Sequence, residues 1–221
     1  WGWRVPFLVG AFIAPVGLYI RRQLPETIDH SEVHDSTAAV LGDLVRHHSR
    51  TIVLGVLIIC GGTLSTYVFN YMATYAITTL HLSPTVGSTL TLTGSVAAIA
   101  GMAFGVWVDR FGRKQMLVLS RVLFVIVVYP AYLVLTSPRA TPTAIVAVNM
   151  FINFVFSIGF GAAYAFLSEA FPKSVRSSGM AIPYALGVTI FGGTTQFVVA
   201  WLIDLTKDPM VPAWYQIIAN V

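Results

Sequence analysis

Long apolar runs, separated by polar connectors, organise the sequence. The runs are Val5–Ile20, with a possible start at Trp3, then Thr51–Ala76, Pro84–Val108, Gln115–Leu135, Thr143–Leu167 and Gly179–Ile203, and another run begins near Pro212. A helix that crosses a membrane needs about 20 mostly apolar residues, whereas a membrane β-barrel would show short strands of alternating character. The pattern therefore predicts an all-α integral membrane protein that crosses the bilayer several times.

Composition agrees with membrane residence. Charged residues are 10% of the chain, hydrophobic residues are 56%, and the mean hydropathy is +0.77. A soluble domain carries about 25% charged residues, so this chain has too few to cover a soluble core. Cys60 is the single cysteine, which excludes a disulfide framework or a cysteine zinc cluster within the chain. We expect neither a metal nor another cofactor.

The positive charges give the orientation. All but Arg4, Arg139 and Lys207 of the 13 Lys and Arg residues fall in three segments, 21–50, 109–121 and 169–178. Positively charged loops remain in the cytoplasm, and an even number of crossings separates these segments. The connector 21–50 also contains His30 and His34 at i, i+4 spacing. Without a third ligand nearby, a solvated linker or helix explains this pair better than a metal site.

The stretch GVWVDRFGRK lies between two apolar runs, and membrane topology alone does not explain its acidic residue and its two glycines. Basic residues alone would anchor a cytoplasmic loop, but Asp109 at the cytoplasmic end of a helix opposes the helix dipole and needs a partner. Gly105 leaves room for a neighbouring helix, which we expect to be the Gly179–Ile203 span, and Gly112 permits a turn with positive φ.

This stretch resembles the signature loop of the major facilitator superfamily of secondary transporters. The matching positions are Gly105, Asp109, Arg110, Gly112, Arg113 and Lys114. The stretch SEAFPKSVRSSGMA is similar to a second cytoplasmic loop of that family, through Glu169, Pro172 and Arg176. The resemblance implies a gating charge network that includes both loops. We expect Asp109 and Arg113 to hold the cytoplasmic side closed, so Asp109→Asn should slow transport more than it weakens binding.

Three further stretches, WGWRVPFLVG, YIRRQLPET and residues 190–215, resemble the metabolite:proton symporter group of this family. The resemblance implies a twelve-helix fold in which residues 1–20 form helix 6, residues 21–50 form the central cytoplasmic loop, and residues 51–221 form helices 7–11 and the start of helix 12. The chain would then be the C-terminal half, with the last helix of the N-terminal half. By itself such a half is expected to be inactive.

The implied function is proton-coupled symport of a small organic acid, of citrate or dicarboxylate type, across a bacterial inner membrane by alternating access. Alternatives are a symporter of a compatible solute such as proline or betaine, and a drug-efflux antiporter of the same fold. The expected partners are the substrate, protons, the lipid bilayer and the missing N-terminal half. No catalytic constellation favours an enzyme, and the scattered basic residues do not favour nucleic-acid binding.

Polar residues inside spans are costly and are therefore substrate-site candidates. We expect this role for Tyr67, Asn70, Tyr71, Asn153 and Gln196, although such side chains also bond helices to each other. No charged residue is predicted deep within a span. Arg121 is expected to lie near the cytoplasmic end and to snorkel towards it, and the proton-coupling carboxylate is expected in the missing half.

Overall fold

The computed structural model describes residues 4–11, 13–23, 37–108, 112–171 and 176–221. The chain divides into two compact units, Trp1–Val40 and Leu41–Val221. In the first unit, α1 (Val5–Ala11) and α2 (Ile13–Gln23) cover the first predicted span as two short helices on either side of residue 12, which lies outside the described residues.

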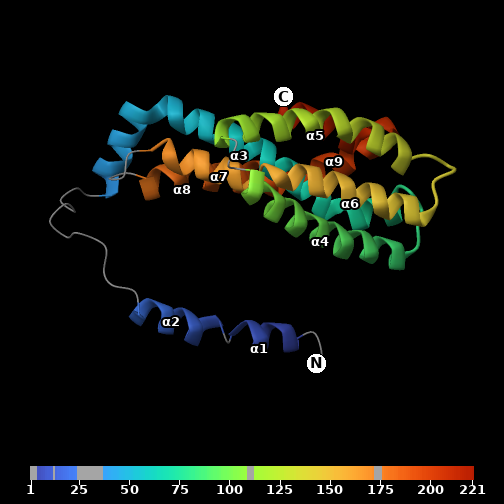
Figure 1. Ribbon diagram of the computed structural model, residues 1–221, viewed down its shortest axis with the longest axis horizontal. Coiled ribbons are helices and arrows are strands. Elements are labelled where there is room, and N and C mark those ends of the chain that lie inside the picture. Colours follow the sequence, from blue (N-terminus) through green and yellow to red (C-terminus); the bar gives the residue numbers. More distant parts are fainter. Residues whose placement is uncertain (1–3, 12, 24–36, 109–111, 172–175) are drawn as a thin grey trace. The chain divides into compact units, whose positions relative to one another are not determined.

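The second unit is a bundle of helices (Figure 1). Its elements are α3 (Thr37–Thr78) from Leu41 onwards, α4 (Pro84–Val108), α5 (Arg113–Leu135), α6 (Pro142–Ile158), α7 (Phe160–Glu169), α8 (Arg176–Leu186), the π-helical segment η4 (Gly187–Gly192), α9 (Gly193–Thr206) and α10 (Val211–Asn220). Five segments of the described chain are long and apolar enough to cross a membrane: Arg46–Thr78, Pro84–Trp107, Lys114–Leu135, Pro142–Glu169 and Gly179–Thr206. They confirm the predicted helical membrane fold and five of its predicted spans.

The connector predicted over residues 21–50 is partly helical. The helix α2 continues to Gln23, and α3 already begins at Thr37. A kink at His48, where φ is −123° and ψ is 18°, separates this first part of α3 from its membrane-length remainder (Figure 1). His30 and His34 lie outside the described residues.

Three glycines on α4 bring it into close contact with α6. A Cβ atom at Gly94 would lie 3.0 Å from the Asn149 amide nitrogen. At Gly101 and Gly105, such an atom would collide with the backbone carbonyls of Phe154 and Ile158. Small residues allow membrane helices to pack backbone against backbone. Gly105 therefore allows α6 to pack closely on α4. The prediction that Gly105 makes room for the Gly179–Ile203 span is wrong.

The helix α4 is also rich in hydroxyl groups, and these bond to their own helix. Ser88, Thr89, Thr91, Thr93 and Ser95 each donate a hydrogen bond to the carbonyl four residues earlier. A hydroxyl that bonds to its own backbone needs no partner on another helix. The polar composition of α4 is thus compatible with a membrane span.

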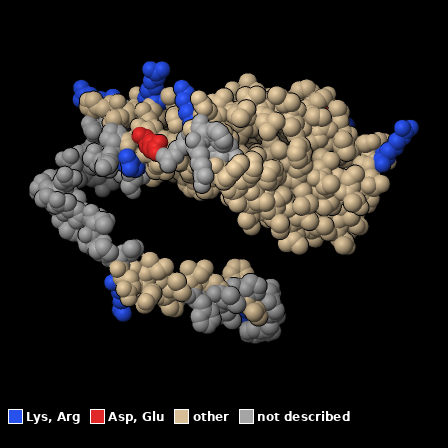
Figure 2. All heavy atoms as spheres, viewed as in Figure 1, with Lys and Arg blue, Asp and Glu red and all other residues tan. Residues whose placement is uncertain are grey.

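Aromatic side chains fill the core between α3, α5 and α6. The Phe124 and Phe156 rings lie 5.1 Å apart, and Phe69 packs on both. Tyr75 is fully buried and donates a 2.6 Å hydrogen bond to the Pro209 carbonyl. The middle of the visible face of this unit is almost free of charge, and its Lys and Arg side chains lie towards the two ends (Figure 2). This distribution is typical of a protein that is surrounded by lipid along its middle.

Two of the membrane-length segments are interrupted. Gly159 separates α6 from α7, and a Cβ atom there would collide with the Ser120 hydroxyl on α5. The other segment contains the π-helical turn η4, whose glycines pack on α3. A Cβ atom at Gly187 would lie 2.5 Å from the Ile59 side chain, and one at Gly192 would lie 2.7 Å from the Tyr67 ring. Single π-helical turns often mark functional sites.

Candidate substrate site

Two adjoining hollows lie along α3. One has a volume of about 150 Å³ and is lined by α3, α4, α6 and the start of α7. The other has a volume of about 260 Å³ and is lined by α3, α5, α7, α8 and η4. Both are lined by Thr66, Asn70 and Phe160, so they lie next to each other. We call the first the amide hollow and the second the arginine hollow.

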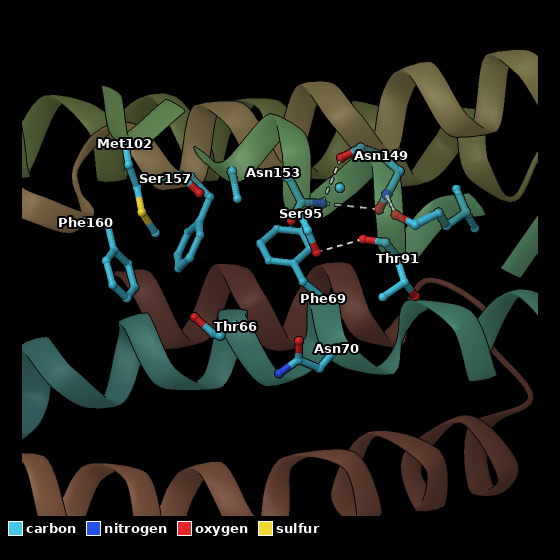
Figure 3. Close-up of a pocket in the computed structure, with 14 residues that line it drawn as sticks. Thr66, Phe69, Asn70, Thr91, Ser95, Met102, Asn149, Asn153, Ser157 and Phe160 are labelled. Atoms are coloured by element: carbon cyan, nitrogen blue, oxygen red, sulfur yellow. Dashed lines mark hydrogen bonds between the residues drawn. The ribbon is translucent and has the colours of Figure 1, made fainter. Parts of the chain in front are cut away.

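The amide hollow is lined by hydrogen-bonding groups from three helices. Thr66 and Asn70 on α3 lie across the space from Thr91 and Ser95 on α4, with Asn149 and Asn153 on α6 beside them (Figure 3). The Asn149 amide donates to the Leu90 carbonyl at 2.9 Å, and the Asn153 amide donates to the Asn149 carbonyl at 2.8 Å.

These bonds occupy donors and leave acceptors. Ser95 donates to the Thr91 carbonyl at 2.8 Å, so its oxygen has lone pairs left. The side-chain oxygen Oδ1 of Asn153 likewise makes no hydrogen bond among the described residues. A ligand part that carries hydroxyl or N–H donors would match this wall better than an anion.

The arginine hollow contains Arg121, whose guanidinium lies deep in the bundle. The guanidinium carbon is 5.0 Å above the Phe156 ring centre, and Nη1 donates a 2.7 Å hydrogen bond to Oδ1 of Asn220. A Cβ atom at Gly62 would lie 3.2 Å from Nη2. Gly62 and Phe156 are each near the middle of their membrane-length segments.

This position corrects two expectations, that no charge lies deep in a span and that Arg121 snorkels to the cytoplasmic end. The Arg121 side chain starts only about 12 Å from the beginning of α5, at 1.5 Å per residue. Its guanidinium is nevertheless held at mid-height, because Phe156 offers a ring face there and Asn220 offers an acceptor. A guanidinium is always protonated, so it is the positive charge of the hollow.

No carboxylate contacts this guanidinium among the side chains that the structure describes. A charged arginine at the centre of a membrane helix costs about 2.5–3.5 kcal/mol on insertion scales. Such residues usually pair with another group or mark a substrate path. A carboxylate ligand would supply the missing partner through charge-assisted hydrogen bonds.

Four aromatic side chains also line the arginine hollow. Tyr67 lies on α3, Phe160 and Tyr164 on α7, and Tyr184 on α8. The ring centres of Phe160 and Tyr164 are 5.1 Å apart, and those of Tyr164 and Tyr184 are 6.3 Å apart. The hollow therefore combines one cationic group with several π faces and phenol hydroxyls.

The five predicted substrate residues divide into two groups. Tyr67, Asn70 and Asn153 line the hollows, and Tyr71 and Gln196 do not. Tyr71 is 9% exposed, belongs to the core and touches a separate hollow beside α9. Gln196 is exposed on α9, and the adjacent Thr195 is the buried residue.

Sequence reasoning missed Arg121 and Asn220 as site residues. Arg121 interrupts the apolar run Gln115–Leu135, and this interruption was a usable signal. Asn220 gave none, because it lies in a segment for which no partner helix could be inferred. The hydroxyl residues Thr91 and Ser95 on α4 were also missed.

The predicted gate lies partly outside the described residues. Asp109, Arg110 and the side chain of Arg113 are not described. Gly112 has a φ of 107°, which fits the predicted turn, and Lys114 is exposed.

In the second cytoplasmic loop, Glu169 is exposed and Nε of Arg176 donates to the Phe171 carbonyl at 3.4 Å. Phe171 is buried and its ring covers Gly179. The charge network between the two loops stays a prediction.

Comparison with known proteins identifies related sequences. A family model described as Major Facilitator Superfamily matches residues 1–192. The chain is 31% identical to a citrate-proton symporter of Salmonella typhi, over 97% of this chain and 50% of that protein. It is 28% identical to the ectoine/proline transporter ProP of Corynebacterium glutamicum, over 97% of this chain and 45% of that protein.

A proline/betaine transporter of Salmonella typhimurium is 25% identical, over 100% of this chain and 46% of that protein. The chain thus spans about half the length of the curated relatives it matches. No solved structure matches it.

Proposed function

The chain belongs to the major facilitator superfamily, and on this premise we propose that it forms part of a secondary transporter for a small organic acid, coupled to protons. The relatives are bacterial, so the proposed location is a bacterial inner membrane. Because the chain spans about half of each relative, this activity belongs to the complete gene product. Transport would proceed by alternating access between two halves.

Arg121 is the observation that carries this proposal. It places a permanent positive charge at mid-height, in a hollow of about 260 Å³, with no described carboxylate against it. Secondary transporters bind their substrates near the membrane midplane. A substrate carboxylate that accepts from the guanidinium would have its charge compensated at the most apolar level of the membrane. The name of the Salmonella typhi relative, a citrate-proton symporter, supports the same substrate class.

A zwitterionic compatible solute is the second candidate, and the aromatic lining favours it. Tyr67, Phe160, Tyr164 and Tyr184 surround the space beside Arg121. Aromatic faces attract quaternary ammonium groups, while the carboxylate of the same solute would bind the guanidinium. The names of the ectoine/proline and proline/betaine relatives support this substrate class. The two candidates share a carboxylate and differ in what lies next to it.

Proton coupling needs a group that takes up and releases a proton during transport. Among the described side chains, none of the Asp and Glu residues lines either hollow. We therefore expect the coupling carboxylate in a part of the gene product that contributes the opposite wall.

Uptake by the complete gene product in membrane vesicles tests the proposal. With an imposed proton gradient, radiolabelled citrate or glycine betaine should accumulate, and a protonophore should abolish that accumulation. Arg121→Gln should raise the apparent KM at least about thirtyfold, because removing one partner of a buried charge pair costs about 2–5 kcal/mol. Arg121→Lys should restore only part of the affinity, because it lacks the bidentate fork.

Two results would contradict the proposal separately. Accumulation that survives the protonophore would exclude proton coupling. Unchanged uptake by Arg121→Gln would exclude the arginine hollow as the carboxylate site. Accumulation of glycine betaine without citrate would favour the second candidate.

A further inference from the structure

Asn220 connects three helices from the end of α10. Its Oδ1 accepts a 2.7 Å hydrogen bond from Nη1 of Arg121 on α5, and its Nδ2 donates a 2.8 Å hydrogen bond to the hydroxyl of Ser65 on α3. Nδ2 also donates to the Gln216 carbonyl within α10, at 2.8 Å. A guanidinium only donates, so the amide oxygen must face Arg121 and the amide nitrogen must face Ser65.

The surroundings hold this amide in place. Ser65 is fully buried, and Asn220 is tied to it from one side. The backbone of α10 also presses against α3, because a Cβ atom at Gly61 would lie 2.5 Å from the Ala219 carbonyl. These contacts fix Asn220 relative to α3 independently of its bond to Arg121. A group with so little freedom can orient its partner at a low cost in entropy.

The bond from Asn220 determines which edge of the guanidinium remains for a ligand. Oδ1 accepts one N–H of Nη1, and one face of the group lies on the Phe156 ring. Nη2 lies beside Gly62, whose missing side chain leaves this nitrogen uncovered on that side. Arg121 and Gly62 line the arginine hollow and Asn220 does not. Asn220 therefore holds the cation from behind while Nη2 faces the space.

We propose that Asn220 is a positioning residue for carboxylate binding, which aims Nη2 of Arg121 into the arginine hollow through the Arg121–Asn220–Ser65 chain. The amide suits this task because it is neutral. It accepts a hydrogen bond from the guanidinium without cancelling its charge, whereas an aspartate at the same place would form an ion pair and compete with the substrate. The inference rests on the proposed carboxylate transport and adds a residue that strengthens the binding of the carboxylate to Arg121.

Kinetics of uptake by variants of the complete gene product test the inference, with radiolabelled citrate and glycine betaine as probes. Asn220→Ala should raise the apparent KM about tenfold and leave the maximal rate within about twofold. The reason is that loss of a hydrogen bond to a charged group lowers affinity by about a factor of ten. Asn220→Asp has the same size and should raise the KM further, since its carboxylate neutralises Arg121. Ser65→Ala, which loosens the amide, should raise the KM by a smaller factor.

Gln216→Met is the matched control on α10. Gln216 is fully buried one turn before Asn220, and its side-chain amide has no hydrogen-bond partner among the described residues. Its backbone carbonyl, which accepts from Asn220, survives the substitution. The KM of this variant should equal that of the parent protein. Size-exclusion chromatography in detergent shows which variants are folded, and Asn220→Asp keeps the test valid if Asn220→Ala does not fold.

The outcomes separate this inference from the proposed function. If Arg121→Gln transports normally, or neither probe accumulates, the proposed function fails and the inference fails with it. If Arg121→Gln loses affinity while Asn220→Asp matches the parent protein, only the positioning role is overturned. A lower maximal rate with an unchanged KM in Asn220→Ala would also overturn it, because that result indicates a merely structural contact.

Discussion

Gly105 lacks a side chain, and this absence allows a direct contact between two helix backbones. The carbonyl of Ile158 occupies the space that a Cβ atom of Gly105 would need, so the backbones of α4 and α6 are in direct contact. Gly101 makes the same kind of contact with the Phe154 carbonyl, one heptad from Gly94. A backbone carbonyl inside a helix cannot move aside as a flexible side chain can. The cost of adding one methyl group is therefore larger here than at most glycines.

We predict that Gly105→Ala lowers the stability of the protein in detergent by about 1–3 kcal/mol, the usual cost of overpacking. A thermal unfolding curve followed by tryptophan fluorescence measures the change. Gly161→Ala is the matched control, because a Cβ atom at Gly161 has nothing within 4 Å. That variant should be as stable as the parent protein or slightly more stable, since alanine favours helix. Equal melting temperatures for both variants would exclude a tight contact at Gly105.

Among the elements, the π-helical turn η4 ends in Gly192, which packs against Tyr67 and Thr63, two residues that line the arginine hollow. A Cβ atom at Gly192 would lie 2.7 Å from the Tyr67 ring and 2.8 Å from the Thr63 methyl group. Gly193, the next residue, is exposed, and a Cβ atom there would meet nothing within 4 Å. Gly192, at the end of the π-helical turn, thus turns its bare backbone towards Tyr67, whereas Gly193, at the start of α9, faces open space.

We predict that Gly192→Ala raises the apparent KM for uptake by about three- to tenfold, because the Tyr67 ring must shift into the hollow. Gly193→Ala introduces the same group at the adjacent position and should leave the KM unchanged. Uptake kinetics of the two variants in vesicles make the comparison. Similar effects from both variants would point to backbone flexibility and not to contact with Tyr67.

The helices themselves were largely predictable, because a long apolar run has few alternatives in a membrane. Five described segments match predicted runs within a few residues at most ends. The interruptions were not predictable. The helix α6 ends at Ile158, and the next residue, Gly159, leaves room for the Ser120 hydroxyl of α5, which no local sequence pattern connects to it.

The site was predictable only where a helix face was evident. Asn70 and Tyr71 are neighbours in sequence and point about 100° apart on a helix, so only Asn70 faces the hollows. The composition of α9 could not reveal that Thr195 and not Gln196 points inward. For Arg121, the sequence gave the residue but not the direction of its long side chain. Phe156 and Asn220, both distant in sequence, determine that direction.

At the scale of the whole bundle, the charges at its ends predict which end faces the cytoplasm (Figure 2). Lys114 is exposed at the start of α5, and Arg139 is exposed in the turn after α5. A membrane-length helix separates them, so a crossing by α5 places them on opposite sides of the bilayer. The clustering of the basic residues predicts that Lys114 faces the cytoplasm.

Cysteine labelling of intact cells checks this orientation. In a Cys60→Ala background, Arg139→Cys should react with a membrane-impermeant maleimide from outside, whereas Lys114→Cys should react only after permeabilisation. Both variants replace an exposed basic residue, so differences in general reactivity are small. The reverse pattern would invert the orientation, and labelling of both from outside would contradict a membrane crossing by α5.

The contact between α4 and α6 also has a consequence for biogenesis. Synthesis proceeds from the N-terminus, so α4 enters the bilayer while α6 is still unmade. During that interval α6 cannot supply hydrogen-bond partners for Ser88, Thr89, Thr91, Thr93 and Ser95. Their hydrogen bonds to the carbonyls four residues earlier are available within α4 from the start. Thr91 and Ser95, which border the amide hollow in the folded bundle, therefore have their hydroxyl groups hydrogen-bonded within α4 before α6 is inserted.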